Sequence, residues 1–202
     1  MKLHWSPKSP YVRKVMVCAH ELGCVQDIAL IRSVAAMLKP NPAIMQDNPL
    51  NKIPTLVLDD GRTLFDSRVI CEFLNARKGG ELFPKDGPAQ WQSLRWQALG
   101  DGLLDALILW RNEREKTPPL AMLMTAFQTK TMATLKQLET ECHALEKASF
   151  SIGSISIACA LGYLDFRFDE LAWRSHAPLL AAWFKTVSDR PSLRATEPGF
   201  DA

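Results

Sequence analysis

The segment of residues 55–65, TLVLDDGRTLF, constrains the fold of this chain more than any other. Two apolar runs typical of β-strands flank the letters DDGR, and the Asp-Gly pair supplies the backbone conformations that a tight hairpin requires. The residues that follow, DSRVICEFLNARKGG, place apolar side chains at helical spacing, begin with a capping residue at Asp66 or Ser67, and end at two glycines. The pattern therefore predicts two paired strands followed by a helix over residues 67–76.

The residues before this hairpin predict a strand, a helix and a second strand. Residues 2–5, KLHW, are typical of a strand, and apolar residues recur at helical spacing over residues 10–22 before Gly23 ends the pattern. Residues 25–31, VQDIALI, predict the second strand, and the Pro- and Asn-rich residues after it predict a loop with at most a short helix near residues 43–47. The order βαβ followed by ββα predicts a small mixed sheet with helices on its faces.

Strand patterns end at a segment rich in glycine and proline, residues 79–87, which we interpret as a linker. Four helical patterns follow, over residues 89–115, 118–148, 150–168 and 177–190. We therefore assign residues 1–78 to an α/β domain and residues 88–202 to an all-helical domain.

Composition excludes several classes of function. The net charge of +2 is too small for the clustered basic surface of a nucleic-acid-binding protein. No apolar run is long enough to span a membrane, and the start of the chain lacks the pattern of a secretory signal. We therefore expect a cytoplasmic protein with neither nucleic acid nor membrane as a partner.

The five cysteines form no CxxC pair and have no metal-type spacing with the histidines. An odd number of cysteines without a secretory signal favours reduced thiols. Cys18, Cys71 and Cys159 lie in apolar helical patterns, so we expect them to be buried, and we expect no metal site.

Two turns contain residues with more than one interpretation. In SPKSPYVRK, Ser9 precedes Pro10 and suits the N-cap of a helix, while Ser6 suits a cap of the preceding turn. Pro54 suits the start of an edge strand, because proline cannot donate a ladder hydrogen bond. A cis Ile53–Pro54 bond, which would turn the backbone of Ile53 toward a peptide-like ligand, is the alternative, although cis bonds are uncommon before proline.

Three segments together resemble the glutathione S-transferase superfamily, of the bacterial type with a serine at the active position: SPKSPYVRKVM, NPLNKIPTLVLDDGRTLFDSRVICEFL and SIGSISIACALGYLDFRF. The resemblance implies a thioredoxin-like N-terminal domain followed by a helical domain, which agrees with the pattern of elements above. It also implies a homodimer that binds glutathione as co-substrate and conjugates it to a small hydrophobic electrophile.

Ser9 matches the family position that faces the sulfur of glutathione. A free thiol is mostly protonated at neutral pH, and a hydroxyl donor beside a helix N-terminus favours the nucleophilic thiolate. Ser6 is the competing candidate. Because the first cysteine is Cys18, inside the first helical pattern, thiol–disulfide chemistry is not expected.

The resemblance also assigns the rest of the glutathione site. Asp66 and Ser67 match the pair that holds the γ-glutamyl end of glutathione. Asp66 pairs with the ammonium of the ligand, and Ser67 binds the γ-glutamyl carboxylate of the ligand. Ile53, just before Pro54, matches the residue whose backbone pairs with the cysteinyl unit. Lys52 is a candidate for the glycyl carboxylate, although its segment is also a plain exposed turn.

Candidates for the second substrate lie in the first long helix of the second domain. Asp101 and Asp105 share one helical face, and in similar relatives an acidic group of this helix reaches the ligand amine across a dimer interface; solvated or interface charge is the simpler interpretation. Trp110, Arg111 and Arg114 are candidates for the electrophile pocket, and core packing explains Trp110 equally well.

The segment FSIGS departs from the family's capping box, because Ser154 stands where the family has an acidic residue. Ser151 is still expected to cap the helix that follows, with Ser154 forming a weaker reciprocal hydrogen bond. Two other functions stay open: a non-catalytic binding or interaction protein with this fold, and a glutathione-dependent isomerase or reductase.

Overall fold

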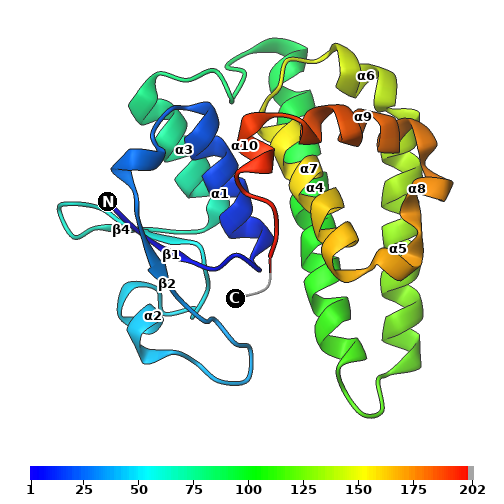
Figure 1. Cartoon of the computed structure of the whole chain (residues 1–202), viewed down its shortest axis with the longest axis horizontal. Helices are drawn as coiled ribbons and strands as arrows, with labels where there is room; N and C mark the ends of the chain where they lie inside the picture. Colours follow the sequence, from blue (N-terminus) through cyan, green and yellow to red (C-terminus); the bar gives the residue numbers. More distant parts are fainter. Residues whose placement is uncertain (200–202) are drawn as a thin grey trace. The chain divides into compact units, whose positions relative to one another are not determined.

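A four-stranded mixed sheet with the order β2-β1-β3-β4 forms the framework of the first structural unit (Figure 1). In the computed structural model, which describes residues 1–199, its strands are β1 (Lys2–Trp5), β2 (Ala29–Arg32), β3 (Thr55–Val57) and β4 (Thr63–Leu64). Strand β1 is parallel to β2 and antiparallel to β3, and β3 is antiparallel to β4. The predicted order βαβ followed by ββα is confirmed, except that a short 3₁₀ turn, η1 (Val25–Asp27), replaces the first part of the expected second strand.

The helices of this unit lie where the sequence predicts, and their ends differ from the predicted ones by at most two residues. They are α1 (Pro10–Glu21), α2 (Pro42–Asp47) and α3 (Ser67–Lys78), and α1 packs against α3. Helix α3 ends because Gly79 adopts a left-handed conformation at φ 63°, which glycine reaches without steric cost. Apolar side chains from the sheet and the helices fill the interior: Leu3, Val15, Leu56, Ile70 and Leu74 are all fully buried.

The end of the chain corrects the expected domain 88–202. The first unit comprises residues 1–83 together with residues 191–199, and the second comprises residues 84–190. Helix α10 (Pro191–Arg194) packs against α1: Arg13 Nη2 donates to the carbonyl of Leu193 at 3.3 Å, and the hydroxyl of Ser192 donates to the carboxylate of Glu21. Residues 200–202, which the prediction included, lie outside the described residues.

Within the described residues, the second unit is entirely helical, as predicted. It contains α4 (Gly87–Arg114), α5 (Ala121–Thr140), α6 (Cys142–Lys147), α7 (Ile152–Arg167), α8 (Trp173–His176) and α9 (Pro178–Ser188), with a 3₁₀ turn, η2 (Asp169–Leu171). The single helix expected over residues 118–148 is two helices, because the chain breaks at Glu141. Helices α4 and α7 lie side by side in this unit (Figure 1).

The start of α7 corrects the expected capping pair. Ser151 occupies the N-cap position, but its hydroxyl accepts a hydrogen bond from the hydroxyl of Ser93 on α4 at 2.9 Å rather than from an amide of its own helix. The amide of Gly153 donates to Ser93 at 3.4 Å. A residue 60 positions earlier in the chain therefore satisfies this helix end, which local sequence could not reveal.

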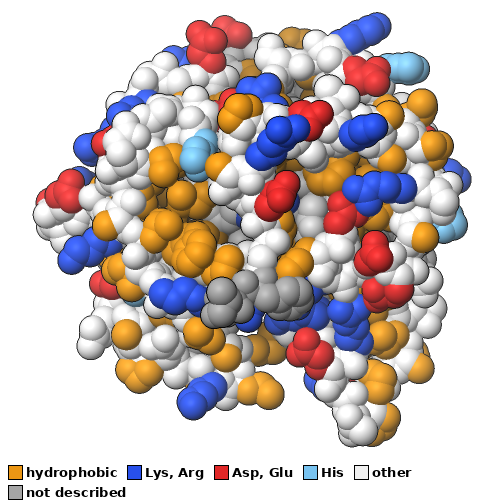
Figure 2. Space-filling model, in the orientation of Figure 1, with side chains coloured by type: hydrophobic (Ala, Val, Ile, Leu, Met, Phe, Trp, Pro, Cys, Tyr) orange, Lys and Arg blue, Asp and Glu red, His pale blue; other side chains and the backbone are white. Residues whose placement is uncertain are grey.

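The cysteines of the described structure agree with the patterns of the sequence. All five cysteines are free and buried, as expected for Cys18, Cys71 and Cys159, and burial raises the pKa of Cys142 to about 11. Acidic and basic side chains are interspersed over the face shown in Figure 2. Over residues 1–199, no helix is long and apolar enough to cross a membrane, and no cluster of side chains suited to a metal ion is found.

Candidate functional site

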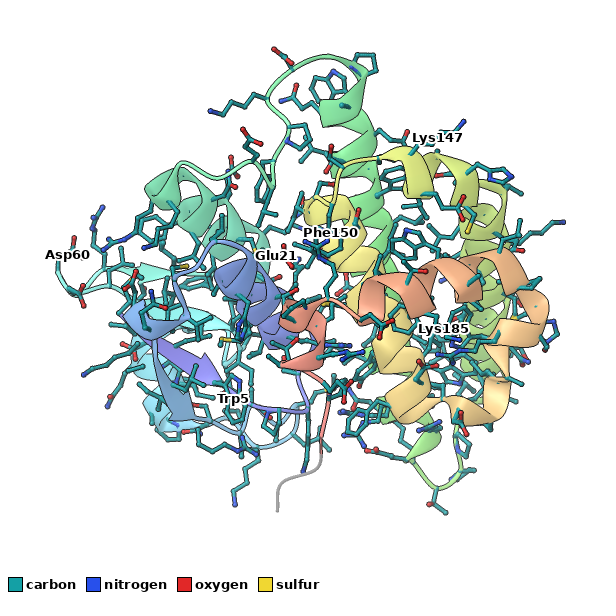
Figure 3. The ribbon with its side chains drawn as sticks, turned by 45° about the horizontal axis from the view of Figure 1, so that its top comes forward. Trp5, Glu21, Asp60, Lys147, Phe150 and Lys185 are labelled. Atoms are coloured by element: carbon teal, nitrogen blue, oxygen red, sulfur yellow. The ribbon has the colours of Figure 1, made fainter. Side chains whose placement is uncertain are left out.

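Strand polarity brings three loops of the first unit to one end of the sheet. Strand β1 ends at Trp5 (Figure 3), and its neighbour β3 runs in the opposite direction, with Thr55 opposite His4. Strand β4 ends at Leu64, opposite Leu56 near the start of β3. The residues after β1, before β3 and after β4 therefore leave the sheet at the same end, and these loops contain all of the glutathione-site residues predicted from the sequence.

Ser9 lies in the first of these loops, as the N-cap of α1. Its side-chain oxygen accepts a hydrogen bond from the amide of Val12 at 3.3 Å, and Pro10 is the first helical residue. The hydroxyl proton of Ser9 has no acceptor among the described residues, so it is available to a ligand. Ser6 is buried, and its oxygen accepts from the amide of Lys8 at 3.4 Å, which agrees with the expected turn cap.

The Ile53–Pro54 bond is cis, as the alternative interpretation of this turn requires, and pairing of the Ile53 backbone with a ligand stays a prediction. The prediction of an edge strand is wrong, because β3 lies between β1 and β4; Pro54 is tolerated since pairing begins only at Thr55. Within the described residues, no hydrogen bond involves the backbone of Ile53. Lys52 is exposed and forms no ion pair with a described residue.

Asn48 holds this turn in place, and sequence analysis missed it. The side chain is 1% exposed, and its Nδ2 donates to the carbonyl of Lys52 at 3.2 Å and to Thr55 Oγ1 at 2.9 Å. The hydroxyl of Thr55 also donates to the carbonyl of Lys52, at 2.9 Å, and Asn48 Oδ1 accepts from the amide of Leu50. The only signal in the sequence is an asparagine in a Pro- and Asn-rich loop, which has no distinguishing pattern.

Asp66 and Ser67 form the N-terminus of α3, in the third loop. Asp66 is the N-cap, with Oδ1 accepting from the amide of Arg68 at 2.9 Å, and its side chain is exposed. Ser67 is only 2% exposed, and within the described chain its hydroxyl has no hydrogen-bond partner. Asp66 therefore also satisfies the capping interpretation, whereas Ser67 makes no cap bond, and a cap at Asp66 is compatible with ligand binding at the same helix end.

His4 is a second residue that sequence analysis missed. It is buried in β1, and its two ring nitrogens lie 2.8 Å from Ser33 Oγ and 2.8 Å from Asp47 Oδ2. These bonds join β1 to the residue after β2 and to the end of α2. His4 thus holds together the end of the sheet at which the site loops begin.

The remaining candidates lie in the second unit, on α4. Asp101 is only 2% exposed, so a solvated charge is wrong for this residue, while Asp105 is exposed. The interface and cross-dimer interpretations of these two residues stay predictions. Trp110 is buried against Phe168, with ring centroids 4.9 Å apart, which agrees with core packing. Arg111 donates from Nη1 to the hydroxyl of Tyr163 on α7 at 3.3 Å.

Comparisons with known proteins agree with this arrangement. The family described as glutathione S-transferase, N-terminal domain, matches residues 8–77, and glutathione S-transferase, C-terminal domain, matches residues 121–186. The Uncharacterized GST-like protein YibF of Escherichia coli is 30% identical, and the alignment covers 98% of each chain.

Two similar crystal structures come from a glutathione transferase family member of Pseudomonas fluorescens Pf-5. The one with bound glutathione has a TM-score of 0.94 and 45% identity, covering 98% of this chain and 99% of the other. The one with bound S-(propanoic acid)-glutathione has a TM-score of 0.90 and 42% identity, covering 99% of this chain and 100% of the other. The chain therefore belongs to the glutathione S-transferase family.

Proposed function

We propose that this protein is a glutathione transferase that binds reduced glutathione at the described end of the sheet and transfers its sulfur to a hydrophobic electrophile. The hydroxyl of Ser9 carries this proposal. Its oxygen is held by the amide of Val12, so the hydroxyl hydrogen is oriented by the helix end and available to a sulfur atom. A donor of this kind stabilises a thiolate more than a thiol.

One hydrogen bond and one helix N-terminus can supply the free energy by which the thiolate must be stabilised at Ser9. A free thiol has a pKa of about 8.5, so lowering it by about 2 units makes the thiolate dominant at neutral pH and needs about 2.7 kcal/mol of differential stabilisation. A hydrogen bond to a charged group contributes about 1.5–3 kcal/mol, and a helix N-terminus adds about 0.3–1 kcal/mol.

The other loops match the remaining groups of glutathione. The free backbone of Ile53 suits the peptide groups of the cysteinyl unit, and the exposed ammonium of Lys52 suits the glycyl carboxylate. Asp66 suits the γ-glutamyl ammonium, while the buried hydroxyl of Ser67 and the first amides of α3 suit the adjoining carboxylate. Glutathione bound to a relative that is 45% identical over nearly the whole chain supports this assignment.

In the proposed reaction the thiol proton passes to solvent when the thiolate forms at Ser9. The sulfur then attacks an electrophilic carbon, a C–S bond forms, and the leaving group departs with its electron pair. The protein's contribution is to raise the fraction of thiolate and to hold the peptide in a fixed position. The resemblance also implies a homodimer, which light scattering at several protein concentrations would test.

The first test is a calorimetric titration with reduced glutathione, followed by a pH titration of the bound thiol by the ultraviolet absorbance of its thiolate. Ser9→Ala should leave glutathione affinity within a few fold while it raises the thiol pKa. Ser9→Gly should raise this pKa equally, and because glycine also suits an N-cap it should cost less stability than alanine. Loss of binding with an unchanged thiol pKa would assign Ser9 to docking and contradict the mechanism.

Substitutions of two acidic residues in the first unit test whether glutathione affinity and the thiol pKa depend on different residues. Asp66→Asn should weaken glutathione binding and leave the thiol pKa unchanged. Asp60→Asn, at the tip of the β3–β4 turn (Figure 3), removes an exposed carboxylate that pairs with Arg62 and should leave binding unchanged. Unaltered affinity in Asp66→Asn would remove that residue from the site. No binding of glutathione at millimolar concentration would favour a non-catalytic interaction protein.

A further inference from the structure

The turn of residues 48–53 contains two of the proposed glutathione-binding residues, and it is attached to the loop of residues 33–41. Asn51 makes this attachment. Its Oδ1 accepts a hydrogen bond from the amide of Asn41 at 2.9 Å, and its Nδ2 donates to the carbonyl of Ala36 at 3.2 Å. The position of the turn therefore depends on the position of this loop.

The same turn is attached to the end of α2 by Asn48, the residue directly after Asp47. The side chain of Asn48 donates to the carbonyl of Lys52 at 3.2 Å. The amides of Leu50 and Asn51 in turn donate to Asn48, each at 3.0 Å. The position of the turn therefore also depends on where α2 ends.

His4 connects the two segments to which the turn is attached. Its ring nitrogens lie 2.8 Å from Ser33 Oγ, at the start of the loop, and 2.8 Å from Asp47 Oδ2, at the end of α2. The residue is 4% exposed, and in the sheet it lies between Ile31 of β2 and Thr55 of β3. The ring thus joins both segments to an inner strand of the sheet.

The local structure of α2 does not account for Asp47. It is the last residue of this helix, where a negative charge opposes the helix dipole. Among the described residues its carboxylate accepts a hydrogen bond only from His4. A carboxylate cannot donate, so His4 Nε2 is the donor in this bond. Asp47 therefore stabilises the attachment of α2 to β1 rather than the helix itself.

We propose that His4 is a positioning residue for glutathione, which holds the turn of residues 48–53 through Asp47 and Ser33 in the conformation that receives the ligand. This proposal rests on the proposed function, because it assigns glutathione to this turn. When the attachment is lost, the turn adopts other conformations, and affinity falls in proportion to the fraction of molecules that keep the binding conformation. The sulfur of the ligand lies at Ser9, on another loop, so its ionisation should not change.

Two aspartates of the first unit provide a matched pair of variants. Asp47→Ala removes the carboxylate that bonds to His4, and Asp27→Ala removes the carboxylate that pairs with Lys78 at 2.9 Å. The two aspartate side chains are 33% and 35% exposed. Asp27 precedes β2, at the opposite end of the sheet from the site loops. Both variants lose a bonded carboxylate of similar exposure, but only Asp47→Ala loses the attachment of the turn.

Calorimetric titration with reduced glutathione and amide hydrogen exchange measure the effect. Asp47→Ala should weaken glutathione binding about tenfold and speed exchange of the Leu50 and Asn51 amides about tenfold, because a hydrogen bond to a charged group orders the turn. Asp27→Ala should change neither quantity. The thiol pKa of bound glutathione should be the same in both variants. Urea unfolding should show a similar loss of stability in both, which separates the local effect from general destabilisation.

Substitutions of His4 test the bond from the other side. Glutamine places an amide N–H donor at about the position of Nε2, so His4→Gln should keep the bond to Asp47 and most of the glutathione affinity. His4→Leu can make neither bond and should weaken binding as Asp47→Ala does. If circular dichroism shows that His4→Leu does not fold, the comparison of Asp47→Ala with Asp27→Ala decides.

The outcomes separate this proposal from the function on which it rests. Unchanged glutathione affinity in Asp47→Ala, or an equal loss in Asp27→Ala, overturns the positioning role even if the wild-type protein conjugates glutathione. A wild-type protein that does not bind glutathione contradicts the proposed transferase. Hydrogen exchange then still tests the attachment: faster exchange of Leu50 and Asn51 in Asp47→Ala alone supports it, and unchanged exchange overturns it.

Discussion

The close approach of α4 and α7 predicts opposite effects for the same substitution at two glycines of one helix. A Cβ added at Gly100 would lie 2.6 Å from the carbonyl carbon of Ser156 and 2.8 Å from the amide nitrogen of Ile157. Ordinary contact begins at 3.4 Å, so the two helices would have to separate by about 0.8 Å. The same Cβ at Gly102 would meet nothing within 4 Å.

The net effect follows from two opposing contributions. Alanine is favoured over glycine in a helix by about 1 kcal/mol, and this gain applies at both positions. Overpacking costs about 1–3 kcal/mol, and the upper part of that range applies at Gly100 because backbone atoms cannot rotate away. We therefore expect Gly100→Ala to lower the free energy of unfolding by about 1–2 kcal/mol, and Gly102→Ala to raise it by about 0.5–1 kcal/mol.

Urea unfolding followed by circular dichroism would measure both variants against the wild type. The matched pair is informative because both substitutions add the same methyl group to the same helix. They differ only in that α7 lies close to Gly100 and not to Gly102. A Gly100→Ala protein as stable as Gly102→Ala would refute the argument from close packing.

Two further predictions concern the site loop and the helical unit. Asn48→Asp replaces the donors to Lys52 and Thr55 with a carboxylate oxygen, so it should lower stability by about 1–3 kcal/mol and weaken glutathione binding while the thiol pKa stays constant; urea unfolding and calorimetry would show both effects. Burial of Glu141 opposes its ionisation, but hydrogen bonds from Arg95, Gln137 and Trp96 outweigh burial and lower its pKa. Because the pKa of Glu141 is lowered, its carboxylate stabilises the folded state at pH values above the ordinary pKa of 4.5, and this stability is lost as the pH falls through the pKa of the folded state. Glu141→Gln should therefore lower the free energy of unfolding by about 1–2 kcal/mol at neutral pH and approach the wild type in acid. Unfolding measured at a series of pH values would show this.

The sequence predicts the fold well wherever the decisive interaction is local. The Asp-Gly pair, the N-cap residues Ser9 and Asp66, and Gly79 each act within a few residues of their own position, and each stands where it was expected. Patterns of this kind also locate the candidate site, because strand polarity brings the three turns to one end of the sheet.

The features that the sequence did not predict depend on partners far away in the chain. Ser151 is satisfied by Ser93 on another helix, and the last described residues join the first unit through Arg13. Asn48 resembles any loop asparagine until its two acceptors are seen. No local pattern distinguishes such residues, since the same residue type between the same neighbours also occurs without a long-range hydrogen bond.

The charge arrangement at the sheet end is complementary to the charges of glutathione, the proposed ligand. The N-termini of α1 and α3 both begin there, and each contributes partial positive charge and unpaired amides. Glutathione offers a thiolate and two carboxylates to such groups, but it also has one ammonium, which a purely positive site would repel. Asp66, as the exposed N-cap of α3, contributes one carboxylate at this edge while its own cap bond occupies a single oxygen. Removing its charge should therefore weaken binding of glutathione more than binding of an analogue that lacks the amino group, and equal losses for the two ligands would show that Asp66 acts through helix capping alone.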